Sequence, residues 1–228
     1  MELSGGFIAA VQDYRYLIDR EYPHKASLKI IGDRYRLSAV ERTLLYRGVF
    51  STTISEGIRK KLISAPPGGS RIYVDGYNVL LTVMNFRLGR ALCIATDGLV
   101  RDTGGVHGTI LHRRALFEEA TAQLYRALAA VQPAEVTMLL DAPVSHSRDH
   151  AAAILRLAPQ DLDIMVKLEK NSDIPLQQVE SGIVVSSDSV IAQRCRSPVW
   201  DAAHAIIIDS WNSASLLDIP GLLTSTSG

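Results

Sequence analysis

Residues 71–81 read Arg-Ile-Tyr-Val-Asp-Gly-Tyr-Asn-Val-Leu-Leu, and this stretch decides the fold class. An apolar run, 72–74, ends on the carboxylate of Asp75. Gly76 then allows a close turn, and Asn78 adds a second polar group just beyond the strand end. Open α/β sheets bind their ligands at the carboxyl ends of buried parallel strands. An ordinary Asp-Gly turn would produce the same local pattern, so the other strand ends decide between the two interpretations.

The rest of the chain after residue 70 alternates apolar strands with helical stretches. The candidate strands are 71–75, 91–96, 135–141, 163–168, 182–187 and 205–209. The candidate helices are 108–131, 147–157, 188–196 and 212–218. This alternation predicts an α/β fold with a mainly parallel sheet and helices on both faces.

The first 64 residues favour helices instead. Phe7 begins a helical apolar spacing over 7–20, and Ser38 with Glu41 forms a capping-box pattern ahead of a third helix. The segment 24–37 is expected to be a short helix or an extended piece, and another short helix is expected at 53–63. The run Ala-Pro-Pro-Gly-Gly-Ser at 65–70 is the clearest linker. The sequence therefore predicts a small helical domain at 1–65 and an α/β domain at 70–220.

The charge of the chain is balanced overall but not along its length. It carries 24 Lys and Arg against 24 Asp and Glu. Residues 1–64 hold 11 basic and 7 acidic side chains, and residues 65–228 hold 13 and 17. A basic front and an acidic back suit a phosphate-binding segment joined to a metal-binding one, although chance gives the same modest excess. The basic candidates, Arg34, Arg36, Arg42 and Arg47, would bind RNA phosphates, or else form a solvated helix face.

Cysteine usage and hydropathy bear on the compartment. Cys93 and Cys195 are far apart, with no Cys-x-x-Cys spacing, which fits two buried thiols in a reduced, cytoplasmic protein. The N-terminus lacks a signal-peptide pattern, and no apolar run reaches the ~18 residues that a membrane span needs. We therefore expect no membrane partner. A homodimer is compatible with the sequence.

Five candidate strands end on an aspartate, which predicts a shared acidic cluster. The residues are Asp75, Asp97, Asp141, Asp188 and Asp209. Carboxylates that meet at one edge of a parallel sheet repel each other unless a cation joins them. Mg²⁺ or Mn²⁺, which prefer hard oxygen ligands, is the expected cofactor. Taken singly, each aspartate is also an ordinary turn or helix cap.

Two polar segments extend the candidate site. Residues 96–105 form an extra strand end and loop that would add Asp97, Asp102 and a phosphate-binding Arg101, or would only make turns. Beyond Asp141, the side chains of His146 and Arg148 would contact a phosphate at the mouth of the site.

The motif Val-Asp-Gly-Tyr-Asn-Val-Leu at 74–80 resembles the opening motif of PIN-like nucleases, especially the NYN branch. Ser-Ser-Asp-Ser at 186–189 resembles a later signature of that superfamily. The resemblance implies that Asp75, Asp141 and Asp188 bind metal, and that Asn78 and Ser186 support them.

The whole chain is also similar to the prokaryotic family called domain of unknown function 434, with a PIN-like companion domain. In the front half the similarity lies at Ile-Ile-Gly-Asp-Arg-Tyr-Arg-Leu and Glu-Arg-Thr-Leu-Leu-Tyr-Arg-Gly. In the back half it lies at Asp-Gly-Tyr-Asn-Val-Leu, Asp-Gly-Leu-Val-Arg-Asp and Leu-Asp-Ala-Pro-Val-Ser.

These observations predict a divalent-metal-dependent nuclease acting on RNA, in which Asp75, Asn78, Asp141 and Asp188 are catalytic. Two alternatives remain open. One is a binding module for RNA or protein that does not cut. The other is an enzyme for a small phosphorylated metabolite, with residues 96–105 as a lid.

Overall fold

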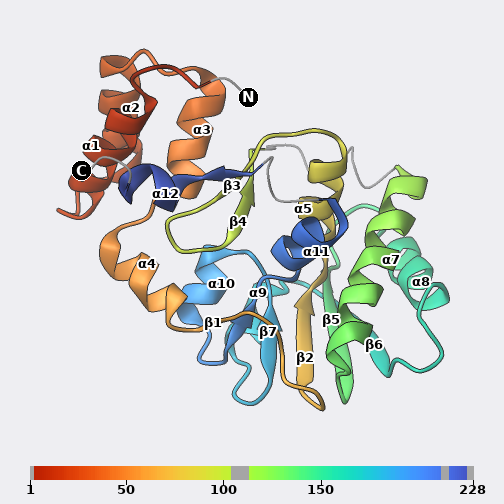
Figure 1. Cartoon of the computed structure of the whole chain (residues 1–228). Helices are drawn as coiled ribbons and strands as arrows, with labels where there is room; N and C mark the ends of the chain where they lie inside the picture. Colours follow the sequence, from red (N-terminus) through yellow and green to blue (C-terminus); the bar gives the residue numbers. More distant parts are fainter. Residues whose placement is uncertain (1–2, 104–112, 212–215, 225–228) are drawn as a thin grey trace.

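A six-stranded parallel sheet forms the centre of the molecule (Figure 1). The computed structural model describes residues 3–103, 113–211 and 216–224. From one edge to the other the strands are β1 (Leu62–Ile63), β8 (Val199–Trp200), β7 (Ile183–Val185), β2 (Arg71–Asp75), β5 (Glu135–Asp141) and β6 (Ile164–Glu169). All neighbouring pairs are parallel, so the carboxyl ends of the strands share one edge.

Alternate strand residues point to opposite sides of this sheet. Both faces therefore carry apolar side chains, and helices cover both. Ile72 and Val74 belong to the core cluster formed with α5 (Gly76–Arg87), α7 (Arg114–Val131), α8 (Ser147–Arg156) and α11 (Ala202–Trp211). Tyr73 and Val184 pack on the other side with α4 (Thr52–Arg59), α9 (Asp173–Gln177) and α10 (Ser189–Arg194). The predicted parallel sheet with helices on both faces is confirmed.

The N-terminal region is helical, as predicted. It comprises α1 (Phe7–Ile18), α2 (His24–Arg34), α3 (Ala39–Gly48) and α4. Ser38 caps α3: its Oγ accepts the Glu41 N–H at 3.3 Å, and the Glu41 carboxylate accepts the Ser38 N–H at 2.8 Å. The capping box is therefore confirmed. The helix predicted at 53–63 ends earlier, at Arg59, because Leu62–Ile63 joins the main sheet as β1.

A second, three-stranded sheet lies next to the N-terminal helices (Figure 1). In it β3 (Leu92–Ile94) pairs antiparallel with β4 (Val100–Asp102) and parallel with β9 (Leu217–Asp218), which leads into α12 (Ile219–Thr224). The strand predicted at 91–96 thus forms outside the main sheet. The helix predicted at 212–218 is wrong at 217–218, which are strand, and its residues 212–215 lie outside the described residues.

The strand predicted at 205–209 is wrong, because these residues belong to α11. Three consecutive isoleucines favour a strand locally, but a short apolar run does not distinguish a strand from a buried helix. The Asp201 carboxylate accepts the His204 N–H at 2.9 Å at the helix start, and Val199–Trp200 takes the place in the sheet. Helix α5 was not predicted, and residues 108–112 of the predicted helix 108–131 lie outside the described part of the chain.

Two further features of the fold bear on the sequence predictions. The predicted linker at 65–70 connects β1 to β2, but β1 already belongs to the main sheet, so the domain boundary stays a prediction. Cys93 and Cys195 are both buried free thiols. Over the described ranges, no helix combines the length and apolarity that crossing a bilayer requires.

Candidate functional site

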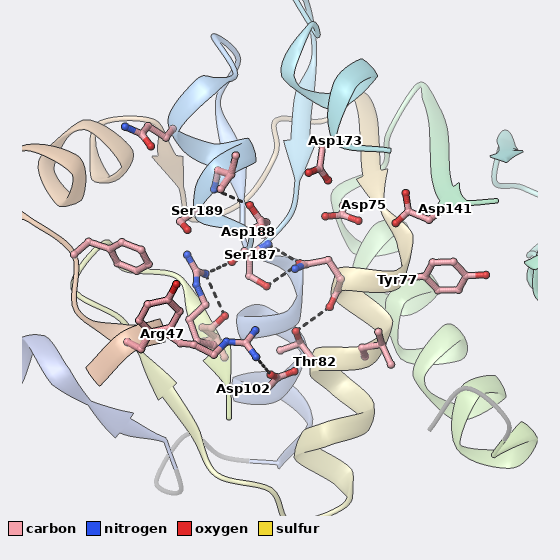
Figure 2. Close-up of a pocket in the computed structure, with 18 of the residues that line it drawn as sticks. Arg47, Asp75, Tyr77, Thr82, Asp102, Asp141, Asp173, Ser187, Asp188 and Ser189 are labelled. Carbon is pink, nitrogen blue, oxygen red and sulfur yellow. Dashed lines mark hydrogen bonds and ion pairs between the residues drawn. The ribbon is translucent and has the colours of Figure 1, made fainter. Parts of the chain in front are cut away.

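A pocket of about 760 Å³ opens at the carboxyl edge of the six-stranded sheet. Four aspartates of this edge line it, and each comes from a different place in the chain: Asp75, Asp141, Asp173 and Asp188. Figure 2 shows Asp75 between Asp141 and Asp173, with Asp188 on the same side of the pocket. Asp75, Asp141 and Asp188 were expected at one edge, because each ends or directly follows a predicted strand.

Asp75 is placed by the passage from β2 to α5. It is the last residue of the strand and the N-cap position of the helix. A Cβ on Gly76 would lie 2.5 Å from Leu140 Cδ2 and 3.1 Å from the Leu139 carbonyl oxygen. Only glycine therefore lets α5 begin directly against β5, and this turn holds the Asp75 carboxyl at the base of the pocket.

The Asp75 carboxyl is buried among other acids. Its side chain accepts a hydrogen bond from Ser186 Oγ at 2.9 Å, and the residue is only 6% exposed. Burial raises the pKa of Asp75, the Ser186 hydrogen bond opposes the rise, and the charges of Asp188, Asp173 and Asp141 add to it; together they bring the pKa to about 7. An acid in this environment favours a proton or a cation beside it.

Asn78 joins helix α5 to the end of β7. Its Oδ1 accepts the Ser187 N–H at 2.8 Å and the Ser187 hydroxyl at 2.9 Å. Ser186 in turn accepts the Asp188 N–H at 3.0 Å. Asn78 and Ser186 thus fix the relative positions of Asp75 and Asp188.

Asp188 and Asp141 also have local structural roles. Asp188 caps α10 by accepting the N–H groups of Val190 at 2.6 Å and Ile191 at 3.1 Å. Asp141 Oδ1 accepts the Ser172 N–H at 2.8 Å. Asp188 therefore does both: its carboxylate caps α10 and also lines the pocket.

Asp173 is the member of the cluster that sequence reasoning missed. It is half-buried at the start of α9, after β6. Burial raises the pKa of its carboxyl above the usual value, and the charges of Asp188 and Asp141 raise it too. The strand-end pattern in the sequence covers only an acid that ends or directly follows a strand. Asp173 follows the end of β6 by four residues, so that pattern does not include it.

The donor chemistry of this edge fits a hard divalent cation. Carboxylate oxygens are the ligands that Mg²⁺ and Mn²⁺ prefer, and the like charges need a compensating cation. Among the residues that the structure describes, no three His, Cys, Asp or Glu side chains meet as a ready-made metal centre. Mg²⁺ commonly keeps several waters and uses one or two carboxylates, so two of the four aspartates with waters suffice.

Asp97 and Arg101 form a buried ion pair instead of joining the acids. Arg101 Nη2 lies 2.8 Å from Asp97 Oδ2, and Asp97 is fully buried. Arg101 also donates to the Ser187 carbonyl oxygen. Burial raises the pKa of the Asp97 carboxyl, and the Arg101 guanidinium opposes that rise. Arg101 lines the pocket but is already bonded to protein, so its first role is to hold the end of β7.

Asp102 and Arg47 form a second ion pair at the pocket wall. Arg47 Nη1 lies 2.9 Å from Asp102 Oδ1, and Asn85 donates to the same carboxylate. Asp102 is buried while Arg47 is one-third exposed. This pair connects helix α3 to β4, across the pocket from the aspartate edge (Figure 2).

The remaining predicted site residues lie elsewhere. Asp209 is exposed on α11, so the acid that the wrong strand placed at the sheet edge is on a helix surface. His146 and Arg148 are exposed, and neither is among the residues that line the pocket. His146 Nδ1 lies 3.1 Å from Asp149 Oδ2.

Asp201 is the strand-end acid that takes the place expected for Asp209. It follows β8 directly, is buried, and accepts the Val100 N–H at 2.7 Å. Burial raises the pKa of its carboxyl. Asp201 is not among the pocket-lining residues, and its hydrogen bonds connect the small sheet to α11. Two residues of strand were too short a signal to detect in the sequence.

Comparison with known proteins places this architecture in a family. Residues 67–205 match the family described as "Domain of unknown function (DUF5616)". The chain belongs to this family. Residues 6–61 match "Protein of unknown function (DUF434)", which confirms the resemblance found in the front half. The chain is 28% identical over 184 residues to "Uncharacterized protein MJ0935" of Methanocaldococcus jannaschii, a match that covers 80% of this chain and 86% of the relative. No solved structure matches this DUF5616 protein.

Proposed function

We propose that this DUF5616 protein hydrolyses phosphodiester bonds in RNA with the help of Mg²⁺ or Mn²⁺. The observation that carries the proposal is the set of four aspartates around one end of a pocket at the carboxyl edge of a parallel sheet. The PIN-like motifs at 74–80 and 186–189 support it, because they contribute Asp75 and Asp188 to that edge. Acids that repel one another over a pocket of ligand size are a costly arrangement without a cation.

In this proposal two of the acids Asp75, Asp141 and Asp188 hold the cation together with waters, and the others, with Asp173 as a fourth acid, add negative charge around it. A bound Mg²⁺ or Mn²⁺ would supply activation of water and charge stabilisation at the phosphate. Ser186 and Asn78 keep Asp75 and Asp188 in register through their hydrogen bonds. Asp75 keeps its proton up to a pH of about 7 in the absence of a cation, so cation binding displaces that proton and strengthens as the pH rises.

The decisive experiment measures cleavage of a labelled single-stranded RNA with Mn²⁺ and with EDTA. We expect Mn²⁺-dependent cleavage that Asp75→Asn reduces by at least about 100-fold, as losing a main electrostatic group does. Asp209→Asn is the matched control: it removes an exposed acid outside the pocket and should leave the rate unchanged. Equal loss in both variants, or cleavage that persists in Asp75→Asn, contradicts the proposal.

A second candidate function is RNA binding without cleavage. It is favoured by the aromatic and basic side chains of Tyr46, Arg47 and Phe50, which line the same pocket. In that case the RNA would bind with a strong dependence on salt concentration, and it would stay intact in Mn²⁺.

A further inference from the structure

The wall opposite the aspartates comes from the N-terminal helices. Tyr46 and Arg47 of α3 and Phe50, just after this helix, line the same pocket as Asp75 and Asp141. Figure 2 shows Arg47 on the far side of the pocket from these two acids. One pocket therefore joins an acidic edge to a wall with two aromatic rings and a guanidinium.

Hydrogen bonds to Thr96, in the turn between β3 and β4, hold the segment that carries Arg47 and Phe50 in place. The Phe50 N–H donates to Thr96 Oγ1 at 2.8 Å, and the Thr96 N–H donates to the Gly48 carbonyl oxygen at 2.8 Å. The Arg47–Asp102 ion pair adds a third connection. Groups that are already fixed lose little freedom when a ligand arrives, which makes the wall suited to binding.

The wall offers contacts that suit a planar group with an anionic end. Aromatic faces stack on bases, and a guanidinium pairs with phosphate. The volume of about 760 Å³ lies within the range of small-molecule sites. A nucleotide combines a flat base with a phosphate. The base would meet the rings, and the phosphate would face Arg47 on one side and, on the other, the aspartates through the cation of the proposed function. A base inside a duplex has both faces covered by its neighbours, so it cannot reach the rings unless it leaves the stack.

We propose that the pocket binds one unpaired nucleotide, with its base against Tyr46 and Phe50 and its phosphate between Arg47 and the aspartate edge. This inference rests on the proposed function, because it names the substrate class of the same site. It also assigns the N-terminal DUF434 region a role in recognition, since that region supplies Tyr46, Arg47 and Phe50.

A neighbouring hollow distinguishes a strand from a free nucleotide. It has a volume of about 460 Å³, shares Tyr46 and Arg47 with the main pocket, and is also lined by Arg42. The next nucleotide of a single strand would lie over this hollow, near Arg42. A free nucleotide would not reach it. A single RNA strand and a free nucleotide would present the same base and phosphate to the main pocket.

The test compares the binding of adenosine monophosphate with that of a six-nucleotide single-stranded RNA, for the full chain with Ca²⁺ present. Calorimetry measures the first and fluorescence anisotropy the second, with a gel to verify that the RNA stays intact. Tyr46→Ala and Phe50→Leu should each weaken the binding of both ligands by at least about fivefold, the loss expected for one stacked base. Tyr22→Ala, which removes a similarly exposed tyrosine outside the pocket, should change neither affinity.

Arg42→Ala decides between the two sources. Weaker binding of RNA with unchanged binding of the mononucleotide identifies a strand, and no change in either identifies a free nucleotide. The inference is overturned if neither ligand binds at millimolar concentration, or if affinities are unchanged in both aromatic variants. RNA cleavage that persists unaltered in those variants leaves the proposed function standing without this inference. Binding that depends on the two rings, without any RNA cleavage, supports this inference and contradicts the proposed function.

Discussion

Two groups of buried or half-buried aspartates lie near the pocket, and they differ in their neighbours. Asp97 and Asp102, on the β3–β4 hairpin, are each paired with an arginine at 2.8 and 2.9 Å. In the described part of the chain, none of the four aspartates at the sheet edge forms an ion pair, and Asp75 instead feels three other acids. The hairpin acids are compensated and hold structure together. The edge acids lack such an ion pair, although the charge of Arg194 partly offsets that of Asp173, and they remain available to a cation.

The comparison shows that burial alone does not distinguish the acids at the sheet edge from acids that hold structure together. Asp97 is more deeply buried than Asp75, yet its charge is already neutralised by Arg101. The raised pKa of Asp75 has burial as its largest cause and other acids as a further one. The two groups of acids therefore differ in the sign of their neighbours' charges.

The largest effect is expected from Arg101→Met, which breaks the compensated pair. Removing one partner of a buried ion pair typically costs about 3–5 kcal/mol, because the other charge is left uncompensated. Arg101→Met should therefore lower the free energy of unfolding by about that amount in urea titrations. The double variant Arg101→Met with Asp97→Leu should recover part of the loss, because it removes the uncompensated charge but does not restore the hydrogen bond to the Ser187 carbonyl oxygen. A single-variant loss below about 1 kcal/mol would show that Asp97 is not held as a buried charge.

In contrast, Asp75→Asn should raise the free energy of unfolding of the metal-free protein at pH 8. The folded pKa of about 7 lies above the usual 3.8, so the folded state keeps a proton that the unfolded state loses. Stability therefore falls as pH rises from about 4 to about 7, by up to about 4 kcal/mol at about 1.4 kcal/mol per pKa unit. Asn at this position removes the fall.

The measurement is urea unfolding in EDTA at pH 5 and pH 8 for the natural protein and for Asp75→Asn. The variant should be the more stable of the two at pH 8, and the difference should be smaller at pH 5. A natural protein whose stability does not change between these pH values would remove the electrostatic basis of the comparison.

The smallest effect is expected from Asp173→Asn. Asp173 is half-buried, and its raised pKa reflects partial burial and the charges of Asp188 and Asp141. Because solvent screens a partly exposed group, the gain in metal-free stability at pH 8 should stay under about 1 kcal/mol. The Mn²⁺ concentration that gives half of the maximal thermal stabilisation should rise. If Asp173→Asn and the exposed Asp209→Asn give the same Mn²⁺ response, Asp173 is not part of the cation site.

Local patterns along the chain were enough to predict several parts of this protein. Strand and helix periods predicted the parallel α/β sheet, and the spacing of Ser38 and Glu41 predicted a capping box that the structure contains. Parallel strands share one carboxyl edge, so Asp75, Asp141 and Asp188 were expected around one place, and all three line the pocket. These inferences need only the alternation of residues along a strand or helix.

Only the tertiary structure decided which segments pair and what faces the acids. Residues 91–96 and 205–209 were both read as strands of the main sheet, but one lies in a second sheet and the other is helix. Asp173 and the wall of Tyr46 and Phe50 reach the pocket through packing between distant segments. Pairing partners and the choice between a strand and a buried helix depend on contacts far away in the sequence, which local periodicity does not encode.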